Sequence, residues 1–444
     1  MKKLLILLLL LPLAVHAQTE DKERDKILKI YNWADYLDMD LIEEFQEWYK
    51  EQTGEDIEII YQTFDINENM LTEIEVGHED YDVVCPSEYI VERMLRRNML
   101  QKIDTTYFQQ TGTPNWTHNV SPWVTDMFQR MAPDDAITVS DYTVGYMWGT
   151  TGILFNTAFV NEDEVQSWDA ILNPRFQKQV FMKDAFRDIY SVLINYCRYD
   201  DILAGKVTRQ QLFEDLSDEN INAVRDLLIK AHPQIAGWET DFGKERMCQG
   251  KVWLNVTWSG DAAWAIDEED EGVDLRYVVP KEGSNAWFDG WVIPIYARNV
   301  KAASYWIDFM CKEENAIRNM EEIGYVSVLG TPGILEEMQD EENDELDATY
   351  FFGPEATNVR LDPVFYPDLS VIERCGLMHD TADRNEAMLE MWARVKGDNL
   401  DWKMLGFIIS VLSFLSAVIL FRKLRVWRRR KMRRQRLREM NALA

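Results

Sequence analysis

Short runs of apolar and β-branched residues take turns along the chain with segments whose hydrophobic residues recur at helical spacing. This order predicts strands followed by helices. Apolar and β-branched residues at 27–31 predict a strand. Hydrophobic residues from Leu41 to Tyr49 then recur at helical spacing, and Gly54 ends that helix. The alternation continues with a strand, a helix, a strand and a helix at 57–63, 70–74, 81–85 and 90–97. Such a β-α-β-α-β order predicts a parallel sheet covered by helices.

The same pattern resumes in the second half of the chain, which indicates a second domain of similar build. Strands are predicted at 251–257 and 273–279, and helices at 261–266 and 302–323. A body of about 385 residues exceeds what one core usually holds. No repeat or low-complexity linker separates the halves, so we expect the chain to cross between two lobes more than once. The acidic run at 340–347 is predicted to be a solvated loop.

Both ends of the chain carry targeting signals. Lys2 and Lys3 precede an apolar run and a small-residue cleavage site at Ala17, which predicts a signal peptide at 1–17. Residues 404–421 hold no charge and predict one C-terminal transmembrane helix. The basic tail at 422–444 is then cytoplasmic. We expect a periplasmic body anchored in the inner membrane, with a Gram-positive cell surface as the alternative.

Net charge changes the range of expected partners. The chain carries −30 in total, but Lys403 to the end holds twelve basic residues and one acidic residue, so the preceding part carries −41. Such a field attracts cations and repels nucleic acid. The five cysteines show neither CxxC pairs nor metal-ligand spacing, so we interpret most of them as core residues.

Catalytic motifs are not found in this sequence. It contains no G-x-S-x-G elbow, no H-E-x-x-H pair, no phosphate-binding loop and no dinucleotide fingerprint. Its five histidines offer little material for acid–base or metal chemistry. A carboxylate-pair hydrolase stays open as a weaker alternative. We therefore expect a binding protein without a cofactor rather than an enzyme.

Aromatic residues stand beside acids at four predicted strand ends. In open α/β sheets ligands bind beyond the carboxyl ends of strands, so these segments are expected to converge. Aromatic rings cover a methylene chain and attract ammonium groups, while carboxylates pair with each charge. Such a site suits a polyamine. The four segments are Asn32 to Tyr36, Pro86 to Tyr89, Trp258 to Asp261, and Trp287 to Asp289.

These and further motifs resemble the periplasmic spermidine/putrescine-binding proteins of ABC transporters, over about 30–396. The order and spacing of the motifs carry the likeness. They are Tyr31-Asn32-Trp33 with Tyr36, Tyr81 to Val84 with Pro86-Ser87 and Tyr89, Tyr146 to Thr150, Trp258-Ser259-Gly260, Pro280 to Gly283, Trp287-Phe288-Asp289 and Ile323-Gly324-Tyr325.

The resemblance implies a set of ligand-binding residues. First-lobe positions and aromatic walls would line the cleft, with carboxylates for the amines. These residues are Trp33, Asp35, Tyr36, Ser87, Tyr89, Asp184, Asp188, Trp258, Trp287, Asp289 and Tyr325. The chain departs from the family pattern at three places. Ala34 replaces a hydroxyl residue, Ala185 stands where an acid is usual, with Asp184 one residue displaced, and Met378 replaces a polar residue.

The resemblance also implies the fold and the mechanism. We expect the two-lobed periplasmic-binding-protein fold, an α/β fold with hinge crossovers near Gly149 and 289–294. Lobe 1 would hold 27–147 and 290–335, and lobe 2 would hold 148–289 and 336–400. The lobes would close on a polyamine and deliver it to an ABC transporter permease. The alternatives are a membrane-anchored polyamine sensor and a binder of another cationic solute.

Overall fold

The computed structural model describes residues 24–109, 112–380 and 384–397, together with 406, 409–411, 413 and 414. The predicted signal peptide at 1–17 and most of the predicted span at 404–421 lie outside these residues. In the part of the chain that is described, no helix combines the length and the apolar composition that crossing a membrane requires. The chain divides into two compact units, Met1–Met388 and Leu389–Ala444.

The strands of the described residues belong to one sheet system in the first unit, in the order β2-β1-β3-β10-β5-β8-β6-β7, with β4, β9, β11 and β12 attached at its sides. The strands are β1 (Ile27–Trp33), β2 (Glu58–Phe64), β3 (Val83–Val84), β4 (Leu100–Gln101), β5 (Thr143–Asn156), β6 (Val180–Lys183), β7 (Ile235–Glu239), β8 (Leu254–Trp258), β9 (Leu275–Val278), β10 (Ser284–Pro294), β11 (Val326–Ser327) and β12 (Cys375–Gly376).

Helices connect these strands. The α-helices are α2 (Asp40–Thr53), α3 (Asn67–Glu75), α4 (Glu88–Arg96), α5 (Trp116–Asn119), α6 (Pro122–Gln129), α7 (Phe186–Cys197), α8 (Tyr199–Leu203), α9 (Arg209–Glu214), α10 (Asp218–Ala231), α11 (Phe242–Cys248), α12 (Ser259–Asp267), α13 (Val300–Met310), α14 (Glu313–Ile323), α15 (Pro332–Glu337), α16 (Thr349–Phe352), α17 (Leu369–Ile372) and α18 (Asn385–Gly397). Short 3₁₀ helices are η1 (Thr105–Phe108), η2 (Val139–Asp141), η3 (Glu162–Val165), η4 (Trp168–Leu172) and η5 (Pro174–Phe176).

The first β-α-β-α-β stretch forms the elements that its hydrophobic pattern predicts. Strand β1 pairs in parallel with both β2 and β3. Helix α2 ends at Gly54, which takes a left-handed conformation (φ 75°) that glycine adopts without a steric penalty. The predicted single helix at 302–323 is wrong, because the structure has two helices there, α13 and α14, with a break at Cys311 and Lys312. Both helices carry apolar faces, so their hydrophobic pattern alone does not reveal the break.

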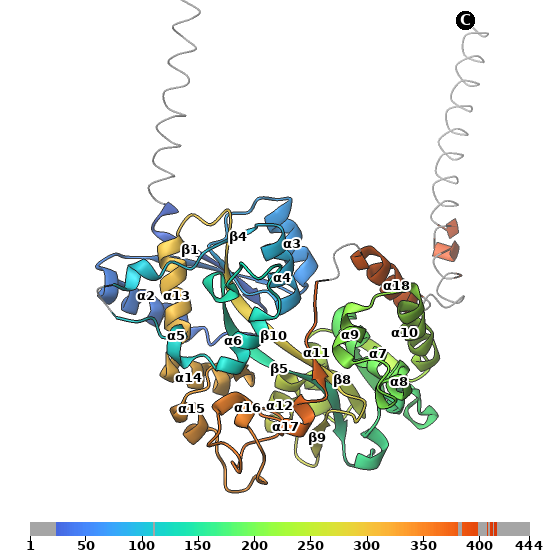
Figure 1. The fold of residues 1–444 in the computed structure, drawn as a ribbon. Coiled ribbons are helices and arrows are strands. Elements are labelled where there is room, and N and C mark those ends of the chain that lie inside the picture. The colour runs from blue at the N-terminus through green and yellow to red at the C-terminus, as the bar shows by residue number, and fades with distance from the viewer. Residues whose placement is uncertain are drawn as a thin grey trace, which may run out of the picture. The chain divides into compact units, whose positions relative to one another are not determined.

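Two long antiparallel strands, β5 and β10, lie side by side and join the two parts of the sheet (Figure 1). The first part of β5, Thr143 to Thr150, pairs with β10, and its second part, Thr151 to Asn156, pairs with β8 and β9. The sheet is therefore mixed and not wholly parallel. All residues of both strands are buried, so neither shows the alternation by which a half-exposed strand is recognised in sequence. The sequence pattern therefore does not predict β5 as an element.

Helices and loops bury the rest of the core against this sheet. Trp148 of β5 stacks on Phe351 of α16 and packs edge-on against Trp123 of α6. The acidic run at 340–347 contains neither helix nor strand and is mostly exposed, in line with the expected loop. The five cysteines are all free thiols, and Cys85, Cys248 and Cys311 are buried. The predicted lobe boundaries stay a prediction.

Candidate functional site

One pocket gathers the ends of six strands that are far apart in sequence. It encloses about 950 Å³ of space not filled by atoms, part of it open solvent. The lining residues are Trp33, Ala34, Asp35, Tyr36, Phe64, Asp65, Ile66, Asn67, Glu68, Ser87, Tyr89, Asp184, Ala185, Phe186, Arg187, Asp188, Thr240, Asp241, Lys244, Trp258, Asp261, Trp287, Asp289, Tyr325 and Met378. All eleven residues singled out from the sequence lie in this lining, whereas their role in binding stays a prediction.

The pocket lies where the strand-end argument placed it, with one exception. Trp33 and Trp258 close strands β1 and β8, while Asp65, Ser87 and Asp184 follow β2, β3 and β6. Carboxyl ends of neighbouring parallel strands meet at one edge of a sheet, which brings these positions together.

The exception is the segment from Trp287 to Asp289, which lies in the middle of β10 and not at a strand end. Its side chains reach the pocket because the register between β10 and β5 shifts between Phe288 and Gly290. At this irregularity Asp289 leaves β5 and forms a bridge with Ser87. Such bulges redirect a side chain, here the carboxylate of Asp289.

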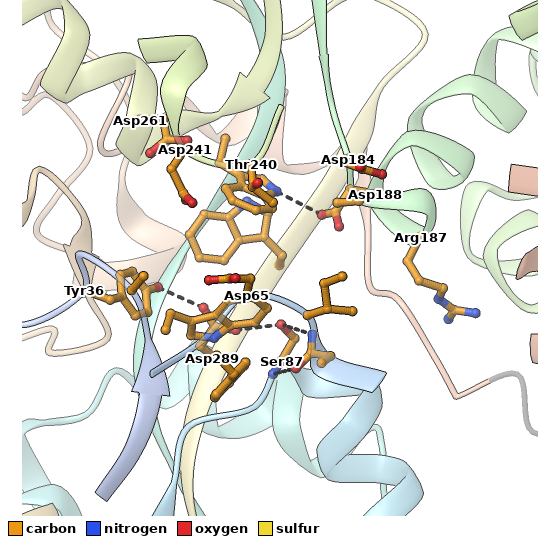
Figure 2. Close-up of a pocket in the computed structure, with 18 of the residues that line it drawn as sticks. Tyr36, Asp65, Ser87, Asp184, Arg187, Asp188, Thr240, Asp241, Asp261 and Asp289 are labelled. Carbon is orange, nitrogen blue, oxygen red and sulfur yellow. Dashed lines mark hydrogen bonds between the residues drawn. The ribbon is translucent and has the colours of Figure 1, made fainter. Parts of the chain in front are cut away.

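Asp289 is held by two hydroxyl groups from the first β-α units (Figure 2). The Tyr36 hydroxyl donates to Oδ2 at 2.8 Å, and the Ser87 hydroxyl donates to Oδ1 at 2.7 Å. Asn67 donates in turn to the Ser87 hydroxyl at 3.0 Å, which orients it. Both donors come from sequence segments more than 200 residues away from Asp289. The carboxylate is thus fixed on one side, and it faces the pocket.

Burial is the main influence on the pKa values of Asp289 and Asp188, the two central acids of the pocket. Asp289 is 6 % exposed and Asp188 is 8 % exposed. Burial raises the pKa of Asp289 to about 7; the hydroxyls of Ser87 and Tyr36 lower it, and the nearby Asp188 charge raises it again. Burial also raises the pKa of Asp188, against the hydrogen bonds that Asn285 and Trp258 donate. Across the described residues, no lysine or arginine lies within ion-pairing distance of either carboxylate.

Aromatic rings form the walls between these acids. The Trp258 indole donates to Asp188 at 3.2 Å, so this ring is fixed beside the carboxylate. Tyr325 packs edge-on against Tyr36, with ring centroids 4.8 Å apart, and lies 5.9 Å from Trp287. Space for Trp287 depends on Gly149 of β5. A Cβ atom at Gly149 would lie 2.5 Å from this indole and 2.4 Å from the Ser259 hydroxyl.

The sequence argument did not single out several charged residues that line the pocket. Asp65 directly follows β2, which the sequence predicts as a strand, so the strand-end argument could have found it. Asp241 follows β7, which the sequence pattern does not predict. Glu68 lies in the first turn of α3, and burial raises its pKa. Lys244 of α11 has no neighbouring motif that signals a site. In total the lining holds eight carboxylates and two basic side chains.

The three departures from the family pattern all lie at the pocket as well. Ala34, Ala185 and Met378 line it, and Met378 approaches the Asn285 amide with its sulfur, at 3.5 Å. Asp184 lines the pocket from the residue before Ala185. Among the described residues, no group of three His, Cys, Asp or Glu side chains is placed to hold a metal ion. What the site offers is carboxylates and aromatic faces.

Two sheet portions joined by β5 and β10, with a deep pocket at the strand ends, define a two-lobed solute-binding protein of the periplasmic-binding-protein fold. The sequence profile of the family described as bacterial extracellular solute-binding protein matches residues 40–340, more than half of the chain. The chain belongs to this family.

Relatives from three bacteria extend the comparison. The chain is 28 % identical over 384 residues to a spermidine/putrescine-binding periplasmic protein of Salmonella typhimurium, covering 86 % of this chain and 94 % of the relative. It is 26 % identical to a putrescine-binding periplasmic protein of Pseudomonas aeruginosa, covering 89 % and 98 %. The crystal structure of the substrate-binding protein of a spermidine/putrescine ABC transporter from Streptococcus pneumoniae is similar, with TM-score 0.60, 27 % identity, and 84 % and 98 % coverage.

Proposed function

We propose that this chain is an extracytoplasmic polyamine-binding protein that delivers spermidine or putrescine to an ABC transporter. The observation that carries the proposal is the pair Asp289 and Asp188. Both carboxylates are buried in an aromatic pocket, and neither has a basic partner within ion-pairing distance in the described part of the chain. Ionising two such neighbours without a counter-charge is costly, and ligand ammonium groups remove that cost.

The surroundings of the pair suit a flexible dication or trication. Rings of Trp258, Trp287 and Tyr325 present faces and edges along which methylene groups can pack. Aromatic faces also attract ammonium groups. The relatives named for spermidine and putrescine support this ligand class over sugars or anions.

Each residue singled out from the sequence receives a role in this proposal. Asp289 pairs with one ammonium group, Asp188 and Asp184 pair with another, and the hydroxyls of Tyr36 and Ser87 orient Asp289. The remaining members, Trp33, Asp35, Tyr89, Trp258, Trp287 and Tyr325, form the walls and the rim.

Closure about β5 and β10 would trap the ligand, since these strands connect both parts of the sheet. The hinge would lie near Gly149 and at 289–294, with the lobes divided as the sequence predicts. The closed form is then the one that the permease recognises.

The charge pattern at the two ends of the chain motivates a periplasmic location with an inner-membrane anchor. Residues 1–17 would direct export, and 404–421 would hold the body at the membrane beside its permease. A truncation after Gly397 should then bind ligand as well as the full chain does and support less uptake of labelled spermidine. Equal uptake by both forms contradicts the tethering role.

A thermal-shift titration of the purified protein tests the ligand class. Putrescine, spermidine and spermine are compared with amino acids and sugars at pH 8. Ligand that binds the folded state alone adds about 2.7 kcal/mol at a hundredfold excess over Kd. We expect a clear rise of Tm with polyamines only. A folded protein whose Tm does not respond to any polyamine refutes the proposal.

A further inference from the structure

Asp261 differs from the central acids because two lysines of the protein already neutralise it. It lies in the first turn of α12, and the Nζ atoms of Lys183 and Lys244 lie 2.5 and 3.6 Å from its carboxylate oxygens. The Tyr325 hydroxyl donates to the same carboxylate at 2.8 Å. Burial alone would raise the pKa of Asp261, but the two lysine charges outweigh it and hold the pKa below its ordinary value.

Lys183 occupies a complete ammonium site made by the protein. Its side chain is fully buried, and its Nζ lies 3.3 Å from Glu239 and bonds the carbonyl oxygen of Thr240. The same atom lies 4.3 Å from the ring centroid of Trp258. Carboxylates, a carbonyl oxygen and an aromatic face are the partners that a ligand ammonium needs. At this end of the pocket, the ammonium of Lys183 already binds these groups.

Lys244 and Asp261 line the pocket side by side, with the Lys244 ammonium 3.6 Å from the Asp261 carboxylate. The same ammonium lies 5.0 Å from the ring centroid of Trp264. Both lysines pair with Asp261, and Lys183 also pairs with Glu239. The two lysine charges act on Asp241 as well, where the charges of Asp261 and Asp65 oppose them. Figure 2 shows Asp241 and Asp261 on one side of the pocket and Arg187 on the other.

Asp289 and Asp188 differ from Asp261 because, among the described residues, no lysine or arginine lies within ion-pairing distance of them, although the Arg187 charge acts on Asp188. These two buried positions match the two ammonium groups of a diamine. A third ammonium extending toward Asp261 would meet the Lys244 ammonium, and like charges in a buried site are strongly unfavourable. Resting on the polyamine-binding function proposed above, we propose that Lys244 is a specificity-determining residue that closes the Asp261 end to a further ammonium and selects a diamine over a triamine.

Calorimetric titration of the full-length protein with putrescine and with spermidine at pH 8 tests this role. The wild type should bind putrescine more tightly than spermidine. Lys244→Met keeps an unbranched side chain of similar length and removes the charge. It should shift the ratio of the two Kd values toward spermidine by about tenfold or more, since like-charge contacts cost at least that factor. Lys244→Gln, a second neutral variant, should do the same.

Two controls separate this role from net charge and from packing. Lys102→Met removes an exposed lysine that does not line the pocket, and it should leave the Kd ratio unchanged. Lys244→Arg retains the charge and should retain the wild-type ratio. A ratio that is equal in wild type and both neutral variants, or a wild type that prefers spermidine, overturns the inference while polyamine binding stands. A wild type that binds neither amine overturns the proposed function and the inference with it.

Discussion

Replacing Asp289 with Asn should stabilise the empty protein and abolish tight polyamine binding. The substitution removes one buried charge and keeps the shape of the side chain. Its carbonyl oxygen can still accept from Ser87, and the Tyr36 hydroxyl can accept from the new amide. The stability gain and the loss of binding have the same origin, because the carboxylate is costly until a ligand cation neutralises it.

The size of the gain follows from the pKa of Asp289. Burial raises this pKa from its ordinary 3.8 to about 7. Below pH 3.8 the carboxyl is protonated in both the folded and the unfolded chain, and the full stability is present. As the pH rises toward 7 the unfolded chain releases the proton first, so stability falls, by about 1.4 kcal/mol per pH unit. The loss ends near pH 7, at about 4 kcal/mol as an upper bound; after relaxation of the site we expect about 2–3 kcal/mol.

Denaturant unfolding of the ligand-free wild type and of Asp289→Asn, from pH 4 to pH 8, measures this difference. The free energy of unfolding of the variant should exceed that of the wild type by an amount that grows between pH 4 and 7. Above pH 7 the difference between the two should stay constant. Asp126→Asn removes an exposed carboxylate and serves as the control for net charge. A difference between variant and wild type that does not change with pH, or a variant that is less stable at pH 8, refutes the reasoning.

Three further predictions concern the other parts of the pocket. Asp188→Asn should weaken putrescine binding at least tenfold by calorimetry, since one ammonium loses its charged partner; unchanged affinity removes Asp188 from the site. Tyr36→Phe removes a hydrogen bond that lowers the pKa of Asp289, so the pH at which half of the putrescine affinity is lost should move upward, and an unmoved midpoint contradicts the assignment. Gly149→Ala places a Cβ 2.5 Å from Trp287, so it should cost about 1–3 kcal/mol in denaturant unfolding and weaken binding. Gly237→Ala is the control, because a Cβ there would lie 3.3 Å from its nearest neighbour, the Phe181 ring; it should cost less stability than Gly149→Ala.

Much of the site could be predicted from the sequence because many of its residues directly follow a strand, a position that the hydrophobic pattern identifies. A strand followed by a helix places its last residues at the carboxyl edge of a sheet, so Trp33, Ser87 and Trp258 could be expected at one cleft. The rule fails for Asp289, which reaches the pocket through a register shift in a continuous strand. The strand-end argument expected Asp289 at this pocket but at the end of a strand, whereas the motif likeness pointed to it without that assumption.

The sequence by itself determined the α/β class, the first β-α units and the acidic, aromatic character of the site, because hydrophobic periodicity and residue type are recorded locally. Only the tertiary structure decided that β5 and β10 join both parts of the sheet. It also decided that Lys183 and Lys244 neutralise Asp261, while no lysine or arginine of the described part of the chain lies within ion-pairing distance of Asp289 and Asp188. Lys183 and Asp261 are 78 residues apart, and Tyr36 and Asp289 are 253 apart. Charges interact over a few ångströms of space, so the balance of a site depends on which distant segments pack together, and no local pattern records that.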